Sequence, residues 1–156
     1  MNWTIKKIVS GGQTGADRAA LDFAIEHGLP HWGWCPKGRR AEDGQIDTRY
    51  QLKETPSMDY GQRTEWNVRD SDGTVIFTLM RTLTGGSKRT ADFVRKHNKP
   101  CLHLSGETTG DPAAELRWFL QANRIEILNV AGSRASKEPG VGDYVKDVLS
   151  KALSDT

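Results

Sequence analysis

Short β-branched runs alternate with helical segments along the whole chain, and this alternation restricts the fold more than any other feature. The runs that read as strands cover residues 5–9, 31–35, 74–79, 100–104 and 125–130. Apolar residues at helical spacing predict helices that begin near Ala16, Gln62, Ser87, Asp111 and Val141. Strands that alternate with helices form a parallel sheet covered on both faces. The sequence therefore predicts an α/β fold of three layers, with a mostly parallel sheet of about five strands and helices on both faces.

The order of the strands decides where a ligand site can form. Right-handed crossovers place every strand-to-helix loop at one edge of the sheet. We expect the order 2-1-3-4-5, in which the first and third strands are neighbours. Ligands in such sheets bind outside the carboxyl ends, where the strand order reverses. The first and third strands are the two that glycine-rich loops follow, so the sequence predicts one shared site.

Length and composition restrict the class of protein. A chain of 156 residues fits one domain, which we expect to span residues 1–156. The net charge of +2 makes nucleic acid an improbable partner. Two cysteines without a paired motif fit a reducing compartment, and no apolar run approaches the ~20 residues that span a membrane. The start of the chain shows no signal-peptide pattern, so we expect a cytoplasmic protein that does not enter a membrane.

The first glycine-rich loop, residues 10–17, reads SGGQTGAD. Its glycines allow the backbone to approach a ligand closely, and the start of the next helix attracts oxyanions. Thr14 and Asp17 have the spacing of a helix cap and a short capping box. The loop lacks the lysine of a P-loop, and an ordinary capped turn is the structural alternative. The residues predicted to bind phosphate here are Gly11, Gly12, Gln13, Thr14, Gly15 and Asp17.

The second glycine-rich loop, residues 84–90, reads TGGSKRT. Ser87 is a suitable helix cap, with Thr90 three residues later. The cations at positions 88 and 89 could face a phosphate or only solvent. Gly85, Gly86, Ser87 and Thr90 are the predicted ligand-binding residues of this loop.

Basic residues follow two other predicted strands. Lys37, Arg39 and Arg40 come after the second strand, where guanidinium groups could clamp a phosphate in bidentate fashion. Ser133 and Arg134 after the fifth strand are a weaker candidate of the same kind. A solvated basic surface is the alternative for both segments.

The histidines, cysteines and tryptophans are expected to have mainly structural roles. Neither His31 with Cys35 nor Cys101 with His103 has the spacing of a zinc site, so no metal site is predicted. Trp118 is expected to pack in a helix face. Trp32, Trp34 and Trp66 could stack on a planar ligand, although burial in a core or an interface is the commoner fate.

Several motifs together resemble the molybdenum carrier (molybdenum cofactor carrier protein) family of the Rossmann-like SLOG superfamily. They are GGQTGAD at 11–17, WCPKGR at 34–39 with AEDG at 41–44, Arg63-Thr64 with Asn67-Val68, and SDGT at 71–74. The resemblance implies a homo-oligomer that holds molybdenum cofactor, a phosphorylated pterin with a dithiolene-bound metal, as cargo. It implies an anion site lined by Gly12, Gln13, Thr14, Gly15, Gly85, Gly86 and Ser87, with positive charge from Lys37, Arg39 and Arg40.

The leading functional hypothesis is a binding or carrier protein for molybdenum cofactor or a related phosphorylated pterin or nucleotide, and enzymatic activity stays open as the second reading. The alternative is a nucleotide phosphoribohydrolase of the Lonely Guy type. That reaction needs a carboxylate near the sugar, for which Asp17, Glu42, Asp72 and Asp92 are available. The chain departs from the motif of those hydrolases at Thr84, which replaces a proline, and at Asp92, the nearest acid. No catalytic residue is assigned.

Overall fold

The computed structural model describes residues 5–153 and has a five-stranded parallel sheet at its centre. In spatial order the strands are β2 (His31–Trp32), β1 (Lys7–Val9), β9 (Ile127–Gly132), β7 (Gly73–Thr78) and β8 (Cys101–Ser105). All four pairings within this sheet are parallel. The prediction of an α/β fold around a parallel sheet is confirmed.

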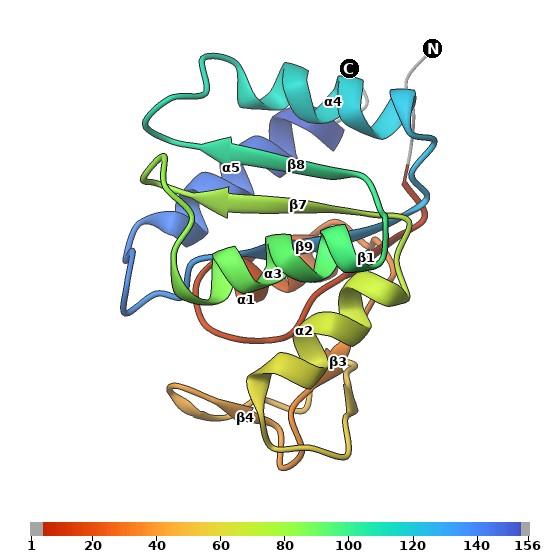
Figure 1. Cartoon of the computed structure of the whole chain (residues 1–156), viewed down its shortest axis with the longest axis vertical. Coiled ribbons are helices and arrows are strands. Elements are labelled where there is room, and N and C mark those ends of the chain that lie inside the picture. Colours follow the sequence, from red (N-terminus) through yellow and green to blue (C-terminus); the bar gives the residue numbers. More distant parts are fainter. Residues whose placement is uncertain (1–4, 154–156) are drawn as a thin grey trace.

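Five helices cover the sheet on its two faces (Figure 1). They are α1 (Ala16–Glu26), α2 (Tyr60–Arg69), α3 (Gly85–Lys96), α4 (Pro112–Ala122) and α5 (Val141–Leu153). Helices α1, α4 and α5 enclose the main hydrophobic core on one face. Helix α3 covers the other face, against β7 and β9, and α2 packs beside it.

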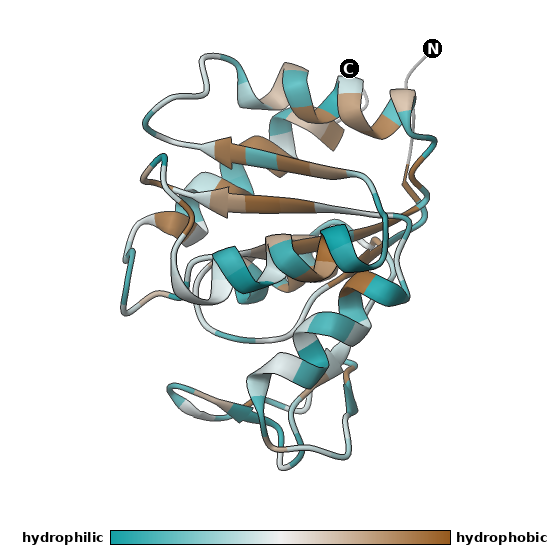
Figure 2. Ribbon diagram, in the orientation of Figure 1, coloured by the Kyte–Doolittle hydropathy of each residue, from teal (hydrophilic) through white to brown (hydrophobic). Residues whose placement is uncertain are grey.

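The two faces of the sheet differ in chemistry because side chains alternate along each strand. Val75 and Phe77 of β7 belong to the main core, and the Phe77 ring meets the Tyr144 ring of α5 edge-on. On the α3 side, Asn129 of β9 donates to the Thr74 hydroxyl at 3.2 Å. Figure 2 shows the apolar residues concentrated along the strands, whereas α2 is mostly hydrophilic. The face of the sheet beneath α3 therefore carries buried polar side chains, and the helix beside α3, which is α2, is polar as well.

The predicted strand order 2-1-3-4-5 is wrong, because the last strand lies in the middle of the sheet. Strand β9 pairs with β1 on one side and β7 on the other, and Asn129 is in register with both Val9 and Thr74. Each strand has the same local pattern whatever its neighbours are, so the local sequence did not reveal this insertion. The segment that follows β9 consequently lies between the two glycine-rich loops.

The predicted second strand, residues 31–35, is divided at Gly33. Residues His31–Trp32 join the central sheet, whereas Trp34–Cys35 (β3) pairs with Lys53–Glu54 (β6) in a separate two-stranded ladder. The division follows from a close approach: a Cβ atom at Gly33 would overlap the carbonyl oxygen of Ser10. The polar stretch after it also forms a small hairpin of β4 (Arg40–Ala41) and β5 (Gly44–Gln45).

Helix α4 begins where the sequence predicts. Asp111 accepts a hydrogen bond from the Ala114 amide at 3.2 Å, and proline occupies the first turn. Leu116, Phe119 and Leu120 are buried as expected. The expectation for Trp118 is wrong, since this residue is 72% exposed on the outer face of the helix.

The other tryptophans form a cluster of their own. Trp34 lies edge-on to Trp32 and to Trp66, and its indole N–H donates to Asp70 at 2.8 Å.

Across residues 5–153, no helix combines the length and the apolar character needed to cross a bilayer.

Candidate functional site

A cavity of about 430 Å³ opens at the carboxyl edge of the sheet, beside the ends of β1 and β9. The first glycine-rich loop and the start of α1 contribute Gly11, Gln13 and Asp17. The second loop and α3 contribute Thr84, Gly85, Gly86, Ser87, Arg89 and Thr90. Helix α2 contributes Tyr60, Arg63, Thr64 and Asn67, and the end of β9 with the loop after it contributes residues 129–134 and Lys137. Both loops therefore face one cavity, although their strands are not neighbours.

The structure brings together nine of the residues predicted from sequence to bind the ligand. They are Gly11, Gln13, Asp17, Gly85, Gly86, Ser87, Thr90, Ser133 and Arg134. The other six, Gly12, Thr14, Gly15, Lys37, Arg39 and Arg40, are not among the described residues that line this cavity.

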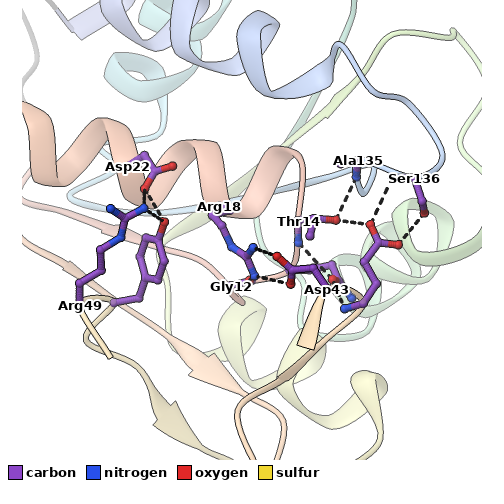
Figure 3. Close-up of polar contacts among 11 residues, drawn as sticks. Gly12, Thr14, Arg18, Asp22, Asp43, Arg49, Ala135 and Ser136 are labelled. Carbon is purple, nitrogen blue, oxygen red and sulfur yellow. Dashed lines mark hydrogen bonds and ion pairs between the residues drawn. The ribbon is translucent and has the colours of Figure 1, made fainter. Parts of the chain in front are cut away.

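The start of α1 differs from the predicted capping box. The N-cap residue is Gly15, with φ of 83°, and it forms no side-chain cap. The Ala16 amide instead donates to the Ser133 carbonyl at 3.0 Å. The Thr14 hydroxyl donates to Glu42 and accepts from the Ala135 amide at 3.1 Å. Thr14 thus joins the first loop to neighbouring segments and does not cap the helix (Figure 3).

The acidic turn of the β4–β5 hairpin holds the first loop in place (Figure 3). Glu42 accepts from both the amide and the hydroxyl of Ser136, at 3.2 and 2.5 Å. These hydrogen bonds, with that from Thr14, lower the pKa of Glu42. Asp43 binds the Arg18 guanidinium, which also donates to the Gly12 carbonyl at 2.9 Å. The hairpin therefore fixes the first loop, α1 and the loop after β9 relative to one another.

Asp17 and Arg63 form a buried ion pair in the wall of the cavity. Asp17 is 8% and Arg63 7% exposed, and the guanidinium nitrogen lies 3.7 Å from the carboxylate oxygen. Arg63 also donates to the Gly11 carbonyl at 2.9 Å and to the Thr64 hydroxyl at 3.1 Å. The side chain of Arg63 thereby ties α2 to the first glycine-rich loop.

Burial raises the pKa of Asp17 to about 6. The charge of Arg63, backbone hydrogen bonds from Gln13 and Gly11, and the charge of Arg18 oppose this increase. Desolvation disfavours the charged form of a carboxyl group, whereas nearby cations and N–H donors favour it. Asp17 is therefore ionised at neutral pH and becomes neutral in mildly acidic solution.

The start of α3 is the more open of the two loops. The N-cap is Thr84, without a side-chain cap hydrogen bond, so the predicted cap at Ser87 is wrong. Ser87 is buried in the first turn, while Gly85 and Gly86 are exposed. The positive end of a helix dipole attracts anions at such a terminus. The ammonium group of Lys137 contacts the hydroxyl group of Thr84, the N-cap residue of α3.

The two arginines of the basic segment after β3 have other partners. The Arg39 guanidinium donates to the carbonyls of Ile46, Asp47 and Tyr50 at 3.0, 2.7 and 3.0 Å. Arg40 donates to the Met58 carbonyl at 3.3 Å and lies over the Tyr60 ring. Positive charge in the cavity wall comes instead from Arg63, Arg89, Arg134 and Lys137.

Arg63 and Lys137 line the cavity but are not among the ligand-binding residues predicted from the sequence. Arg63 belongs to a motif of the family resemblance, and that is the one signal that could have identified it. Nothing in the local sequence sets Lys137 apart from other surface lysines, because it reaches the cavity only through the position of β9.

Of the four carboxylates considered for hydrolysis, Asp17 alone lines the cavity within the described part of the chain. Glu42 lies in the hairpin, and Asp72 accepts from the amides of Glu126 and Ile127 at 3.0 and 2.8 Å. Asp92 is exposed and pairs with Arg95. Residues 5–153 contain no group of three histidine, cysteine or acidic side chains placed to hold a metal ion.

Comparison with known proteins places this architecture in a family. The chain is similar to a crystal structure of a putative molybdenum carrier protein from Syntrophus aciditrophicus SB, with a TM-score of 0.96 and 46% sequence identity. The match covers 99% of this chain and 98% of that protein. No protein of curated function gives a significant match. The model of the circularly permutated YpsA SLOG family matches residues 8–153. The chain therefore belongs to this SLOG family, whose Rossmann-like fold it shares.

Proposed function

We propose that this protein binds and carries molybdenum cofactor or a related phosphorylated pterin or nucleotide in the cavity between α2, α3 and the first glycine-rich loop. The observation that carries the proposal is the charge of the cavity wall. Four cationic side chains and one carboxylate line it, so an anionic ligand is favoured. The similar protein from Syntrophus aciditrophicus is named as a molybdenum carrier, which supports the choice of cargo.

The phosphate group of the ligand is proposed to lie at the start of α3. The backbone at Gly86 has no neighbouring atom within 4 Å of a Cβ position, so a ligand can approach the first turn closely. Arg89 and Lys137 line the cavity there and supply charge. Charge-assisted hydrogen bonds contribute roughly 1.5–3 kcal/mol each. Three or four of them are enough for micromolar affinity after ordering costs.

In the hydrolase alternative, Asp17 would be the carboxylate near the sugar, because it alone of the four candidate acids lines the cavity in the described part of the chain. This carboxylate is buried beside Arg63, and the backbone amides of Gln13 and Gly11 favour its charged form by lowering its pKa. Such contacts hold the carboxylate in place, whereas a general base or nucleophile must reach the sugar of the substrate. The geometry favours binding without chemical conversion. Incubation with nucleoside monophosphates, with release of free base as the readout, separates the two functions.

Gly86→Leu tests the site. The open space around Gly86 accommodates a side chain in the protein, and that side chain then occupies the position proposed for the phosphate. We expect native mass spectrometry of the purified wild-type protein to show a bound phosphate-containing molecule. In the variant we expect at least about tenfold weaker binding, because the steric block removes contacts worth more than about 1.4 kcal/mol.

Gly110→Leu is the matched control, since Gly110 also has open space and lies outside the cavity wall. The proposal fails if Gly86→Leu retains the ligand at wild-type occupancy, or if the two variants lose it equally. The same spectra give the number of chains per particle and so test the expected homo-oligomer.

A further inference from the structure

The two glycine-rich loops face one cavity but differ in the groups of the protein that already occupy the surroundings of their backbone amides. Either loop alone could bind a phosphoryl group, because glycine-rich turns before helices present N–H groups to anions. If both positions were free, the cavity would suit a diphosphate. Which amides are available therefore limits how many phosphoryl groups the ligand can carry.

Several amides in the first loop and just after it have acceptors inside the protein. The Thr14 amide donates to the side-chain oxygen of Gln13 at 3.1 Å, and the Arg18 amide donates to the Gln13 carbonyl at 3.0 Å. The Ala16 amide is bound to Ser133, as described above. The backbone amides of Gln13 and Gly11 lower the pKa of the Asp17 carboxyl group, so they favour its charged form. An external phosphate would have to displace these acceptors.

Asp17 also places a negative charge where a second phosphoryl group would lie. Its carboxylate is buried in the cavity wall, with Arg63 as the nearest charged partner at 3.7 Å. A phosphoryl oxygen in the same turn would meet that charge in a region with little solvent to screen it. Arg63, already engaged by Asp17 and Gly11, adds little to hold a second anion.

The second loop lacks such an internal anion. No acidic residue lies in the first turn of α3, and Thr84 forms no side-chain cap. Arg89 and Lys137 are the cationic side chains of the cavity wall at this end. The amides of Ser87 and Lys88 donate to the Thr84 carbonyl at 3.2 and 3.5 Å. The difference between the loops is therefore one of charge: a buried carboxylate lies beside the first loop, and no acidic residue lies in the first turn of α3.

We propose that the Asp17 carboxylate fills the anion position of the first glycine-rich loop, so that the cavity accepts one phosphoryl group, at the start of α3, and disfavours a diphosphate. This inference rests on the proposed function and assigns the ligand to the class of phosphate monoesters. Asp17 acts here as a determinant of specificity and takes no part in a chemical step.

The test compares calorimetric affinities for inorganic phosphate and pyrophosphate at pH 8, above the pKa of about 6 at which Asp17 ionises. We expect the wild-type protein to bind phosphate at least as tightly as pyrophosphate. Asp17→Ala empties the first loop of its internal anion and should raise the affinity for pyrophosphate relative to phosphate by about tenfold or more. Asp17→Asn removes the charge with little change in shape, so it should shift the ratio in the same direction if the alanine variant folds poorly.

Asp92→Ala is the control, because it removes one carboxylate from an exposed position outside the cavity wall. Its ratio of affinities should equal that of the wild type. A wild-type protein that prefers pyrophosphate by tenfold, or a folded Asp17→Asn variant with an unchanged ratio, overturns the inference and leaves the proposed function standing. A wild-type protein that binds neither anion overturns both.

Discussion

At the scale of single residues, Asp17 lowers the stability of the folded protein at neutral pH, because its charged carboxylate is buried in the cavity wall. Its pKa is raised from 3.8 to about 6 because burial disfavours the charged carboxylate. The folded state therefore holds the proton more tightly than the unfolded chain. The stability that this group contributes is fully present below pH 3.8 and is lost as the pH rises through about 6. The loss amounts to about 3 kcal/mol, since each pKa unit corresponds to about 1.4 kcal/mol.

Asp17→Asn removes this titration while keeping nearly the same shape. We expect the free energy of unfolding of the variant, relative to the wild type, to increase by about 3 kcal/mol between pH 3.5 and pH 8. Urea denaturation at a series of pH values measures the difference. Asp92→Asn, at an exposed position, should show no comparable trend. A difference between Asp17→Asn and wild type that stays constant with pH would contradict the assignment of the raised pKa to Asp17.

The sequence identified Asp17 as a candidate for the site, but for the wrong physical reason. Its spacing from Thr14 predicted a capping box, whereas Gly15 is the N-cap and the Asp17 side chain lies beside Arg63. A capping pattern depends on local spacing alone. The partner of a buried charge comes from wherever the fold brings another element, and α2 is distant from the first loop in the sequence.

At the scale of elements, Arg39 stabilises the segment between β3 and α2. This segment has only two-residue strands, so its backbone carbonyls need partners other than a long ladder. The guanidinium of Arg39 supplies hydrogen bonds to four of them, those of Ile46, Asp47, Tyr50 and Leu52. Arg39→Ala should lower the free energy of unfolding by about 2 kcal/mol, the scale of charge-assisted hydrogen bonds. Chemical denaturation measures this effect.

Arg40→Ala and Lys37→Ala are the controls for that prediction, because both residues are exposed. They should change the free energy of unfolding by no more than about 0.5 kcal/mol. Phosphate affinity should be close to that of the wild type in all three folded variants, since none of these side chains lines the cavity in the described structure. Weakened phosphate binding in Arg39→Ala with an unchanged stability would reverse the role assigned here.

The positions of the larger elements were predictable because each depends on its own residues. The strand at β7 and the helices α4 and α5 follow from apolar spacing and from the Asp111–Pro112 start. The division of the second strand at Gly33 was not predictable in this way. It depends on the approach of the Ser10 carbonyl, a contact between separate segments that no local pattern records.

At the scale of the whole molecule, the insertion of β9 between β1 and β7 creates the site. With the predicted order, the two glycine-rich loops would be direct neighbours. In the observed order, residues 129–134 form the floor between them and bring Arg134 and Lys137 to the cavity. Parallel strands with similar apolar patterns can be arranged in several orders. The sequence therefore predicted that the loops share a site but not which segment lies between them.

Because the cavity wall combines segments from both ends of the chain, ligand binding should stabilise the molecule as one unit. Gly11 comes from the loop after β1, Arg63 from α2, Gly86 from α3 and Lys137 from the loop before α5. A ligand at a hundred times its Kd raises the free energy of unfolding by about 2.7 kcal/mol. For a chain of this size that corresponds to an increase in Tm of about 5–10 °C. Scanning calorimetry with increasing inorganic phosphate should show a single transition that moves upward in the wild type and stays fixed in Gly86→Leu. A transition that splits in two, with one part insensitive to phosphate, would show that the segments around the cavity do not unfold together.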